Sequence, residues 1–379
     1  MDFHLTKEQL MVRKMVREFA ESEVKPLAAE IDENDRFPME TVKKMAKLGM
    51  MGFYMPKEYG GAGGDMLSYV ICIEELAKVC GTTAVIMSAH NSLGCAPILD
   101  NGTEEQKRKY LPDLCSGRKL AAFALTEPNA GTDAGALQTT AVLEGDHYVL
   151  NGSKCFITNG NADVFLVMAL TDPKAGNRGI SGFIVEKGFP GFSIGGKERK
   201  MGVRGSYTCD LFFEDCIVPK ENLLGKENKG FKLAMKGLDG GRIGIAAQAL
   251  GLGESAIDEA VKYVTERILF KRRLSQFQNT QFQLADMRAR MQAAQYLVYA
   301  AACKKQCHEP YSEDASIAKL FASEAASDVT RRAVQLMGGY GYSRDYPVER
   351  MMRDAKITEI YEGTSEVQRM VISGAMGVN

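Results

Sequence analysis

The chain has 379 residues, of which 45% are hydrophobic and 25% are charged, and its formal net charge at pH 7 is -1. A chain with this length and balance is expected to fold into two or three globular domains. The near-zero charge gives no sign of nucleic acid or an anionic membrane as a partner. No stretch approaches the roughly 20 apolar residues that cross a bilayer.

Nine cysteines are scattered along the chain, and the N-terminus carries an acid at Asp2. With no signal-peptide pattern in front of them, an odd number of dispersed cysteines predicts free thiols in a reducing cytoplasm. Cys303, Cys307 and His308 lie close together in sequence, but no second pair of ligands is nearby. We therefore expect no metal site.

Three zones follow one another along the chain. Residues 1–118 carry apolar side chains at helical spacing, residues 119–229 contain short apolar runs typical of strands, and residues 230–379 return to long helical patterns. We predict an α+β fold with an N-terminal helical domain, a central and mostly antiparallel β-domain, and a C-terminal four-helix bundle. A β-domain between two helical domains is an unusual order and is therefore informative.

Individual elements can be placed within these zones. Asn151-Gly152 and Asn159-Gly160 predict turns, and the second and third predicted strands form a hairpin. Strands are predicted at 120–125, 141–143, 148–150, 164–170, 180–185 and 209–213, and long helices at 243–263, 283–307 and 316–337.

One segment, residues 251–256, matches the letters of a dinucleotide-binding loop through Gly251 and Gly253. That loop works where a strand turns into a helix, because its glycines let the backbone approach a pyrophosphate. Here no strand precedes the segment, and the surrounding pattern is helical. We interpret it as part of a helix.

The C-terminal region holds a candidate functional acid, Glu362, which is followed by Gly363. Ser365 and Gln368 have the spacing of a capping box, which predicts a helix start near Glu366 and leaves Glu362 in the short connection before it. A glycine at this point permits a tight turn and the close approach of a ligand. From spacing alone, a solvated loop acid is the simpler interpretation.

This same segment, residues 357–369, resembles the active-site segment of the acyl-CoA dehydrogenase family, in which the matching glutamate is the catalytic base. The likeness extends from the first predicted helix to the last. Further runs that resemble the family are 123–133, 154–159, 200–206 and 335–342. The resemblance implies a flavoprotein in which Glu362 removes the proton alpha to a thioester carbonyl.

The implied chemistry demands an unusual carboxylate. A free glutamate, with a pKa near 4.3, is far too weak a base for a C–H bond alpha to a carbonyl. Burial raises a carboxylate pKa by up to about 3–5 units. The resemblance also implies two donors to the thioester oxygen, the backbone N–H of Glu362 and a ribityl hydroxyl of the flavin, each contributing about 3–4 kcal/mol. Desolvation and the flavin must supply much of the remainder.

By resemblance, the cofactor is FAD, and several segments hold it. Thr126 and Thr158 are implied to hydrogen-bond the flavin ring system, and Phe156 stands where the family often has tryptophan. Arg267 and its neighbours are implied to act across a subunit boundary. The full implied set is Phe123, Leu125, Thr126, Gly131, Thr132, Phe156, Ile157, Thr158, Arg267, Phe270, Phe277, Gln278, Gln335, Gly338, Gly339, Thr364 and Glu366.

The implied substrate-side residues are Thr132, Asp239, Arg242 and Gly363. Some relatives place their base immediately before the arginine that matches Arg242. This chain has Gly241 there, which leaves Glu362 as the candidate base at a known family position.

The chain departs from the family pattern after Phe270. A glycine usually follows this phenylalanine, whereas here Lys271 follows it, and Arg272 and Arg273 add further charge. Lys271 disfavours a positive φ, so the loss of glycine restricts the turn. The added charges either bind phosphates or form a solvated face.

The resemblance implies FAD-dependent α,β-dehydrogenation of a short-chain acyl-CoA, with electrons passed to an electron-transferring flavoprotein. Run in reverse, the same site is an enoyl-CoA reductase of the crotonyl-CoA or caffeyl-CoA type, supplied by a bifurcating flavoprotein. A third interpretation, a non-catalytic flavin-binding assembly protein, is disfavoured by the retention of Glu362 and Arg242. The expected assembly is a cytoplasmic homotetramer built as a dimer of dimers. The acyl group and the physiological direction stay open.

Overall fold

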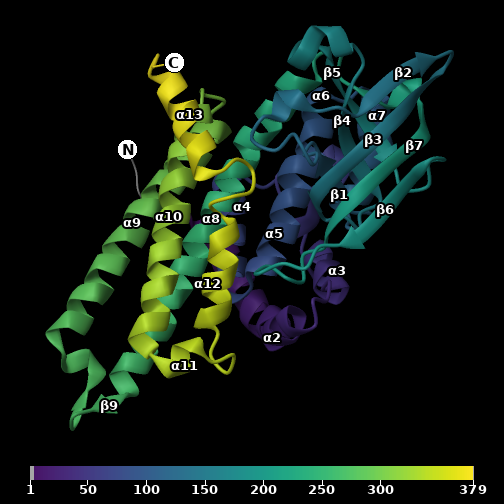
Figure 1. Ribbon diagram of the computed structural model, residues 1–379. Coiled ribbons are helices and arrows are strands. Elements are labelled where there is room, and N and C mark those ends of the chain that lie inside the picture. Colours follow the sequence, from purple (N-terminus) through teal and green to yellow (C-terminus); the bar gives the residue numbers. More distant parts are fainter. Residues whose placement is uncertain (1–3, 379) are drawn as a thin grey trace.

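The structure is a computed structural model that describes residues 4–378. Helices form both ends of the chain, and a β-domain stands to one side of them (Figure 1). The N-terminal helices are α1 (Lys7–Phe19), α2 (Lys25–Glu33), α3 (Met39–Lys47), α4 (Met66–Val79), α5 (Gly81–Ala89), α6 (Ala96–Asn101) and α7 (Glu104–Cys115).

Local capping fixes where several of these helices begin. Thr6 and Gln9 form a reciprocal capping box at the start of α1, so two backbone donors gain partners. A glycine-rich loop at 60–65 ends at Asp65, whose Oδ1 accepts from the Ser68 N–H at 2.7 Å and caps the start of α4.

The β-domain is a mostly antiparallel sheet, as predicted, with the strand order β6-β7-β3-β2-β4-β5-β8 and with β1 pairing parallel to β4. Its inner faces carry the apolar side chains that the strand patterns indicated. The strands are β1 (Ala121–Ala124), β2 (Thr140–Glu144), β3 (His147–Thr158), β4 (Val164–Leu170), β5 (Ile180–Glu186), β6 (Phe192–Lys197), β7 (Thr208–Pro219) and β8 (Leu223–Leu224). The sequence pattern did not indicate β6 or β8.

The turn predicted at Asn151-Gly152 is wrong, because both residues lie inside the long strand β3. The ladder with β7 shifts register between Leu150 and Gly152, which marks a bulge. Gly152 has a φ of 147°, and a Cβ there would lie 2.5 Å from the Thr139 Oγ1. The glycine therefore allows a close approach within the sheet. The turn predicted at Asn159-Gly160 is confirmed, with Asn159 at a φ of 56°.

Three long C-terminal helices, α8, α9 and α10, pack against one another, and α12 lies along α8 and α10 (Figure 1). The elements of this region are α8 (Gly230–Glu266), β9 (Ile268–Leu269), β10 (Arg272–Arg273), α9 (Gln278–Gln306), α10 (Ser312–Met337), α11 (Gly339–Tyr342), α12 (Val348–Ile357) and α13 (Ser365–Ala375). Gly251 and Gly253 lie in the middle of α8, where a Cβ on Gly253 would clash with the Met291 side chain. Here the glycines serve close helix packing.

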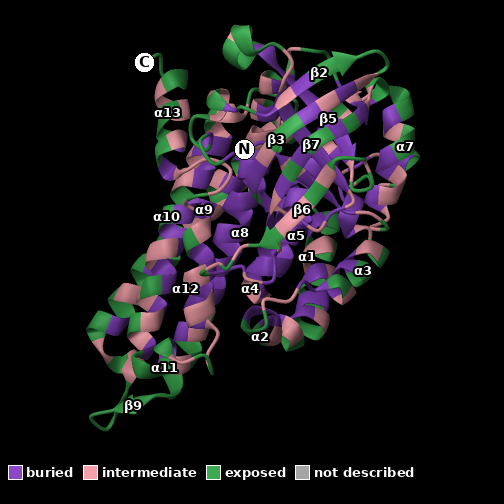
Figure 2. Cartoon of the chain, turned by 45° about the vertical axis from the view of Figure 1, so that its right-hand side comes forward, coloured by how far each residue is buried: buried purple, intermediate pink, exposed green. Residues whose placement is uncertain are grey.

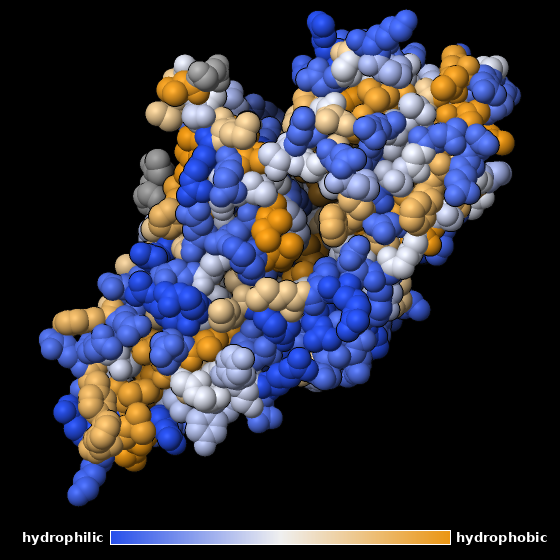
Figure 3. Space-filling model, viewed as in Figure 1, coloured by the Kyte–Doolittle hydropathy of each residue, from blue (hydrophilic) through white to orange (hydrophobic). Residues whose placement is uncertain are grey.

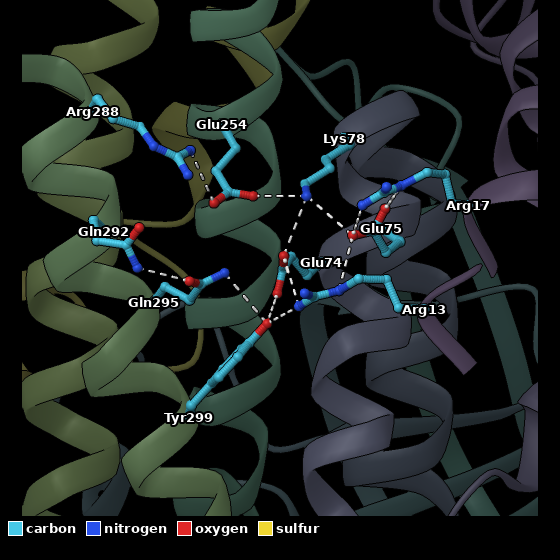
Figure 4. A network of polar contacts seen from close by, with 10 residues as sticks. All are labelled: Arg13, Arg17, Glu74, Glu75, Lys78, Glu254, Arg288, Gln292, Gln295 and Tyr299. Atoms are coloured by element: carbon cyan, nitrogen blue, oxygen red, sulfur yellow. Dashed lines mark hydrogen bonds and ion pairs between the residues drawn. The ribbon is translucent and has the colours of Figure 1, made fainter. Parts of the chain in front are cut away.

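Buried residues concentrate where α4, α5 and α8 meet (Figure 2). A polar network ties this region to α1 and α9 (Figure 4). Glu74 and Glu75 on α4 are 0% and 1% exposed, and Arg17 grips Glu75 through two hydrogen bonds of 2.9 and 3.0 Å. The Tyr299 hydroxyl donates to Glu74 at 2.6 Å. Because buried charges need partners, this network couples the N-terminal helices to the C-terminal ones. Within residues 4–378, no helix is long and apolar enough to cross a membrane.

Candidate active site

Glu362 lies in the turn between α12 and α13, with a φ of 54°, and Gly363 follows at a φ of 101°. A left-handed backbone at a non-glycine residue costs about 1–3 kcal/mol and persists where the surroundings enforce it. The helix after the turn begins at Ser365, one residue before the predicted Glu366. Its N-cap is Thr364, whose Oγ1 accepts from the Val367 N–H at 3.3 Å, so the capping box predicted for Ser365 and Gln368 is wrong.

Three side chains hold this turn by its carbonyl groups. The Arg242 Nε donates to the Glu362 carbonyl at 3.3 Å, and the Gln368 Nε2 donates to the Gly363 carbonyl at 2.8 Å. Lys319 on α10, which is 0% exposed, donates from Nζ to the same Gly363 carbonyl at 2.7 Å. Among the described residues, the Glu362 N–H donates to no partner. This amide is therefore available to a ligand.

Residues of α8 and α10 hold the Arg242 side chain in place. Its Nη1 donates to the Asp239 Oδ1 at 2.6 Å and to the Ser316 Oγ at 3.4 Å, and the residue is only 4% exposed. Burial lowers the pKa of Arg242, while the nearby Asp239 and Glu362 carboxylates oppose that shift. Burial raises the pKa of Asp239, and Arg242 opposes it. Because the charges of Arg242 and Asp239 compensate each other, the pair holds the Arg242 side chain in a fixed position against the turn.

The Glu362 carboxylate packs over the helix α8 at Gly241, where a Cβ would overlap its Oε2. That oxygen is buried and has no hydrogen-bond partner. Burial raises the pKa of Glu362 to about 7, and the cations Lys319, Arg242 and Lys305 only partly oppose the shift. A carboxylate in this setting is a far better base than a solvated one at neutral pH.

Tyr361, the residue before Glu362, fixes the turn against the N-terminal helices. The Tyr361 hydroxyl hydrogen-bonds the Gln248 Oε1, and the Gln248 Nε2 donates to the Gly81 carbonyl at 2.9 Å. Gln248 is fully buried on α8. The position of Glu362 thus depends on contacts from α5, α8, α10 and α13.

A second group of predicted residues gathers at β1 and β3 in the β-domain. The Cys155 N–H donates to the Thr126 carbonyl at 3.0 Å, which joins the two predicted flavin segments directly. Lys154, fully buried, pairs with Glu127 at 2.7 Å and donates to the Leu125 carbonyl at 3.1 Å. Neither Glu127 nor Lys154 was given a role from the sequence, although both stand in the matched runs.

The side chains of this β-domain group are unequally available to a ligand. Phe156 has a φ of 57° and is 64% exposed, so its ring lies open on the surface. Gly131 and Thr132 are exposed, and Thr126 and Thr158 are partly buried. Leu125 and Ile157 are buried in the sheet, and Phe123 is partly buried.

The remaining predicted flavin residues lie elsewhere. Arg267, Phe270, Phe277 and Gln278 belong to the β9–β10 hairpin and the start of α9, at the end of the long helices away from the β-domain (Figure 1). Gln335, Gly338 and Gly339 lie near this hairpin at the end of α10, where the Arg267 guanidinium sits 5.5 Å from the Tyr340 ring. One chain therefore does not bring the two groups together, whereas Thr364 and Glu366 adjoin Glu362 at the start of α13.

Lys271 adopts the conformation that a lysine disfavours, with a φ of 62°, next to Phe270 at 49°. Two consecutive positive φ values form the tight two-residue turn that joins β9 to β10. Phe270 is 89% exposed at the tip. Arg272 stacks on Phe277 at 5.0 Å and donates to the Gln276 carbonyl at 3.0 Å, so its charge is partly engaged within the hairpin.

A hollow opens between the C-terminal helices and the β-domain, with hydrophobic side chains on its walls (Figure 3). Two lysines near Glu362 were not singled out from the sequence. Lys319 stands on a helix face of small residues that includes Ala315, Ala318 and Ala322, and a lone lysine on such a face could have been flagged. Lys305 near the end of α9 carried no such signal.

Family models for the acyl-CoA dehydrogenase N-terminal, middle and C-terminal domains match residues 6–118, 122–216 and 228–377. The chain belongs to the acyl-CoA dehydrogenase family. A relative within it, a short-chain specific acyl-CoA dehydrogenase of Clostridium acetobutylicum, is 65% identical over 99% of both chains. A subunit of the caffeyl-CoA reductase–Etf complex of Acetobacterium woodii is 49% identical over 98% of this chain and 99% of its own.

Solved structures agree with this membership of the acyl-CoA dehydrogenase family. The butyryl-CoA dehydrogenase of Megasphaera elsdenii superposes with a TM-score of 0.98 and 52% identity, and the match covers 99% of this chain and 100% of that one. Membership implies a flavin. The open Phe156 ring, the exposed Gly131 with nothing within 4 Å of a Cβ, and the unpartnered Glu362 Oε2 fit such a group.

Proposed function

We propose that this protein catalyses the α,β-dehydrogenation of a short-chain acyl-CoA thioester, with Glu362 as the base and FAD as the hydride acceptor. The observation that carries the proposal is the Glu362 carboxylate, whose Oε2 is buried without a partner and whose pKa burial raises to about 7. At neutral pH a useful fraction of such carboxylates is ionised and able to accept a proton. Protonation is favourable because it removes a buried charge. A structural glutamate would carry its full set of partners.

The residues around the turn supply the rest of the proposed site. The free Glu362 N–H donates to the thioester oxygen and stabilises the negative charge that forms when the alpha proton leaves. Arg242, Lys319 and Gln368 hold the turn by its carbonyls, which keeps amide and carboxylate in a fixed relation. Asp239, Gly363 and Thr132 belong to the proposed substrate side.

FAD supplies the two-electron acceptor in this proposal. We assign its ring to the β-domain group, with the Phe156 ring as a stacking surface and Thr126 and Thr158 as hydrogen-bonding residues, while Thr364 and Glu366 adjoin the base. Because Arg267, Phe270, Phe277, Gln278, Gln335, Gly338 and Gly339 lie at the other end of the helices, we assign them to the cofactor of a second copy of the chain. This division supports a homo-oligomer, and we propose a tetramer.

The electron partner in this proposal is an electron-transferring flavoprotein. The reductive direction is the second candidate, and the similarity to the caffeyl-CoA reductase–Etf subunit favours it. Either direction uses the same base, because Glu362 returns the proton when an enoyl-CoA is reduced. A cytoplasmic location and the domain boundaries after residues 118 and 229 stay predictions.

The purified yellow protein provides the test. Under anaerobic conditions, butyryl-CoA should bleach the flavin absorbance of the native protein, and Glu362→Gln should bind flavin and thioester with nearly all bleaching lost. An active Glu362→Gln enzyme would refute the assignment of the base. Crotonyl-CoA added to the dithionite-reduced protein measures the reverse step, and comparing the two rates with an electron-transferring flavoprotein present decides the direction.

A further inference from the structure

Lys305, a partly buried residue in the last turn of α9, directs its ammonium group toward α8 at Gly240 without an anionic partner. Its Nζ lies 5.3 Å from the ring centre of Tyr54 and 5.8 Å from that of Tyr311. Among residues 4–378, these two rings are the close partners of this nitrogen, which forms no ion pair or hydrogen bond there. Cation–π contacts offset only part of the cost of removing an ammonium from water.

This ammonium lies over the same stretch of α8 as the proposed base. A Cβ on Gly240 would lie 2.6 Å from the Lys305 Nζ, and a Cβ on Gly241 would overlap the Glu362 Oε2. The two charged groups therefore pack over successive residues of α8, and this geometry keeps Nζ within about 12 Å of the carboxylate. The Tyr54 ring that flanks Lys305 also packs edge-on against Tyr69 at 4.8 Å.

The electrostatic surroundings leave Lys305 poorly compensated. Burial lowers its pKa to about 8, although Asp100, Asp239 and Glu362 oppose the shift and Lys236 adds to it. At neutral pH the group is charged, but any apolar atom placed against it removes more of its remaining hydration. Such contact is unfavourable because a charge without a partner loses solvation and gains nothing.

We propose that Lys305 determines the acyl-chain length that this site accepts, because its ammonium group excludes apolar chains longer than butyryl. The proposal rests on the acyl-CoA dehydrogenase activity proposed above. Each added methylene lengthens an extended chain by about 1.3 Å, so an octanoyl group reaches about 5 Å further than a butyryl group. A butyryl tail ends close to the alpha carbon from which Glu362 removes the proton, whereas an octanoyl tail extends into the reach of the ammonium.

A chain-length series tests the proposal. The ratio of kcat/KM for octanoyl-CoA to that for butyryl-CoA is measured in the native holoenzyme and in Lys305→Met, which keeps the length and removes the charge. We expect the ratio to rise at least about tenfold in Lys305→Met, the discrimination that a few buried atoms provide. Lys305→Arg keeps the charge and should not raise it. Lys304→Met is a matched control, because Lys304 is paired with Asp314 at 2.7 Å on the outer side of the same helix turn.

The pH dependence of the same ratio separates a charge effect from a size effect. In the native enzyme the ratio should rise as pH increases through about 8, because Lys305 loses its charge there. In Lys305→Met it should be flat. The titration of Glu362 affects both substrates and cancels in the ratio. The other groups facing this lysine are Asp100 from α6, Asp239 and Lys236 from α8, and Tyr54 and Tyr311.

The possible outcomes are distinct. An unchanged ratio in Lys305→Met, in an enzyme whose native form oxidises butyryl-CoA, overturns the role of Lys305 and leaves the proposed function standing. A native holoenzyme that oxidises neither thioester overturns both. If Lys305→Met does not retain FAD, Lys305→Gln provides the same comparison with a polar, uncharged side chain. If the ratio rises in Lys305→Met but does not change with pH in the native enzyme, the result also counts against a charge effect.

Discussion

The Glu362 carboxylate lies directly over Gly241, in the space that a Cβ at position 241 would occupy. The glycine belongs to one face of α8 that also includes Gly237, Gly240 and Gly244, which recur at the spacing of a helical stripe. At Gly240, Gly241 and Gly244 the space of a Cβ is filled by a side chain from another element. The position of the proposed base therefore depends on the missing side chain at Gly241 of α8 as well as on the turn that carries Glu362.

Gly241→Ala should displace the Glu362 carboxylate and lower kcat by about 100-fold, because a misplacement near 1 Å at a reacting group costs that much. Flavin content should be unchanged, since Gly241 contacts the Glu362 side chain and none of the residues assigned to the flavin. Gly237→Ala is the matched control on the same face, because the nearest atom to its Cβ is the Pro97 Cγ at 3.7 Å, an ordinary contact. Steady-state kinetics with butyryl-CoA compare the two variants. Equal rates would show that the Glu362 carboxylate reaches an equally active position despite the added methyl group.

Glu362→Gln should make the protein more stable above neutral pH. Burial raises the pKa of Glu362 to about 7 in the folded state, above its value in an unfolded chain. A raised carboxylate pKa means that the folded state holds the proton more tightly, so stability from this group is present at low pH and lost as pH rises through about 7. Glutamine does not ionise and avoids this loss.

The expected gain in the free energy of unfolding at about pH 8 is on the order of 1–3 kcal/mol, since one pKa unit corresponds to about 1.4 kcal/mol. At about pH 4.5 the variant and the native protein should unfold alike. Chemical denaturation of both proteins at the two pH values measures the difference. A constant difference at both pH values would mean that the gain comes from packing.

Elements with strong local periodicity could be predicted from the sequence. The strands 164–170 and 180–185 coincide with β4 (Val164–Leu170) and the core of β5, because continuous apolar runs fit a sheet buried on both faces. The strand β6 was missed because Phe192–Lys197 contains Gly195 and Gly196 and is only partly buried. The long helices α8, α9 and α10 begin before their predicted starts, since polar end turns carry no apolar pattern.

Only part of the candidate site could be predicted from the sequence. Glu362 was found through resemblance to a family, because a turn glutamate has no distinctive local pattern. Lys305 and Gly240 could not be paired from the sequence, because their contact arises only when α9 packs beside α8. The pair of Glu127 and Lys154 likewise depends on the segment after β1 lying against β3. Long-range contacts of this kind are not encoded in periodicity.

Lys154→Met should destabilise the β-domain and weaken flavin binding. Lys154 is fully buried, and its loss leaves Glu127 without its cation in the interior. Removing one partner of a buried pair costs about 3–5 kcal/mol. The Glu127 carboxylate would still accept from the Gln138 N–H at 2.6 Å and the Thr139 N–H at 3.1 Å.

The double variant Lys154→Met with Glu127→Gln separates charge from shape. It removes both charges, so it should recover part of the lost unfolding free energy. Flavin fluorescence on titration with FAD and thermal unfolding measure the two effects. If the double variant is as unstable as Lys154→Met, the unpaired Glu127 charge is not the cause.

Lys271→Gly should stabilise the protein by about 1 kcal/mol, because a left-handed backbone costs a side-chain-bearing residue roughly 1–2 kcal/mol and glycine nothing comparable. Lys271 has a φ of 62° at the tip of the β9–β10 hairpin. Lys271→Ala is the control, since it removes the same charge but keeps a Cβ and should give no gain. Thermal unfolding of the three proteins at equal concentration measures the difference. Equal gains for glycine and alanine would mean that charge repulsion with Arg272 and Arg273, and not backbone strain, destabilises the hairpin.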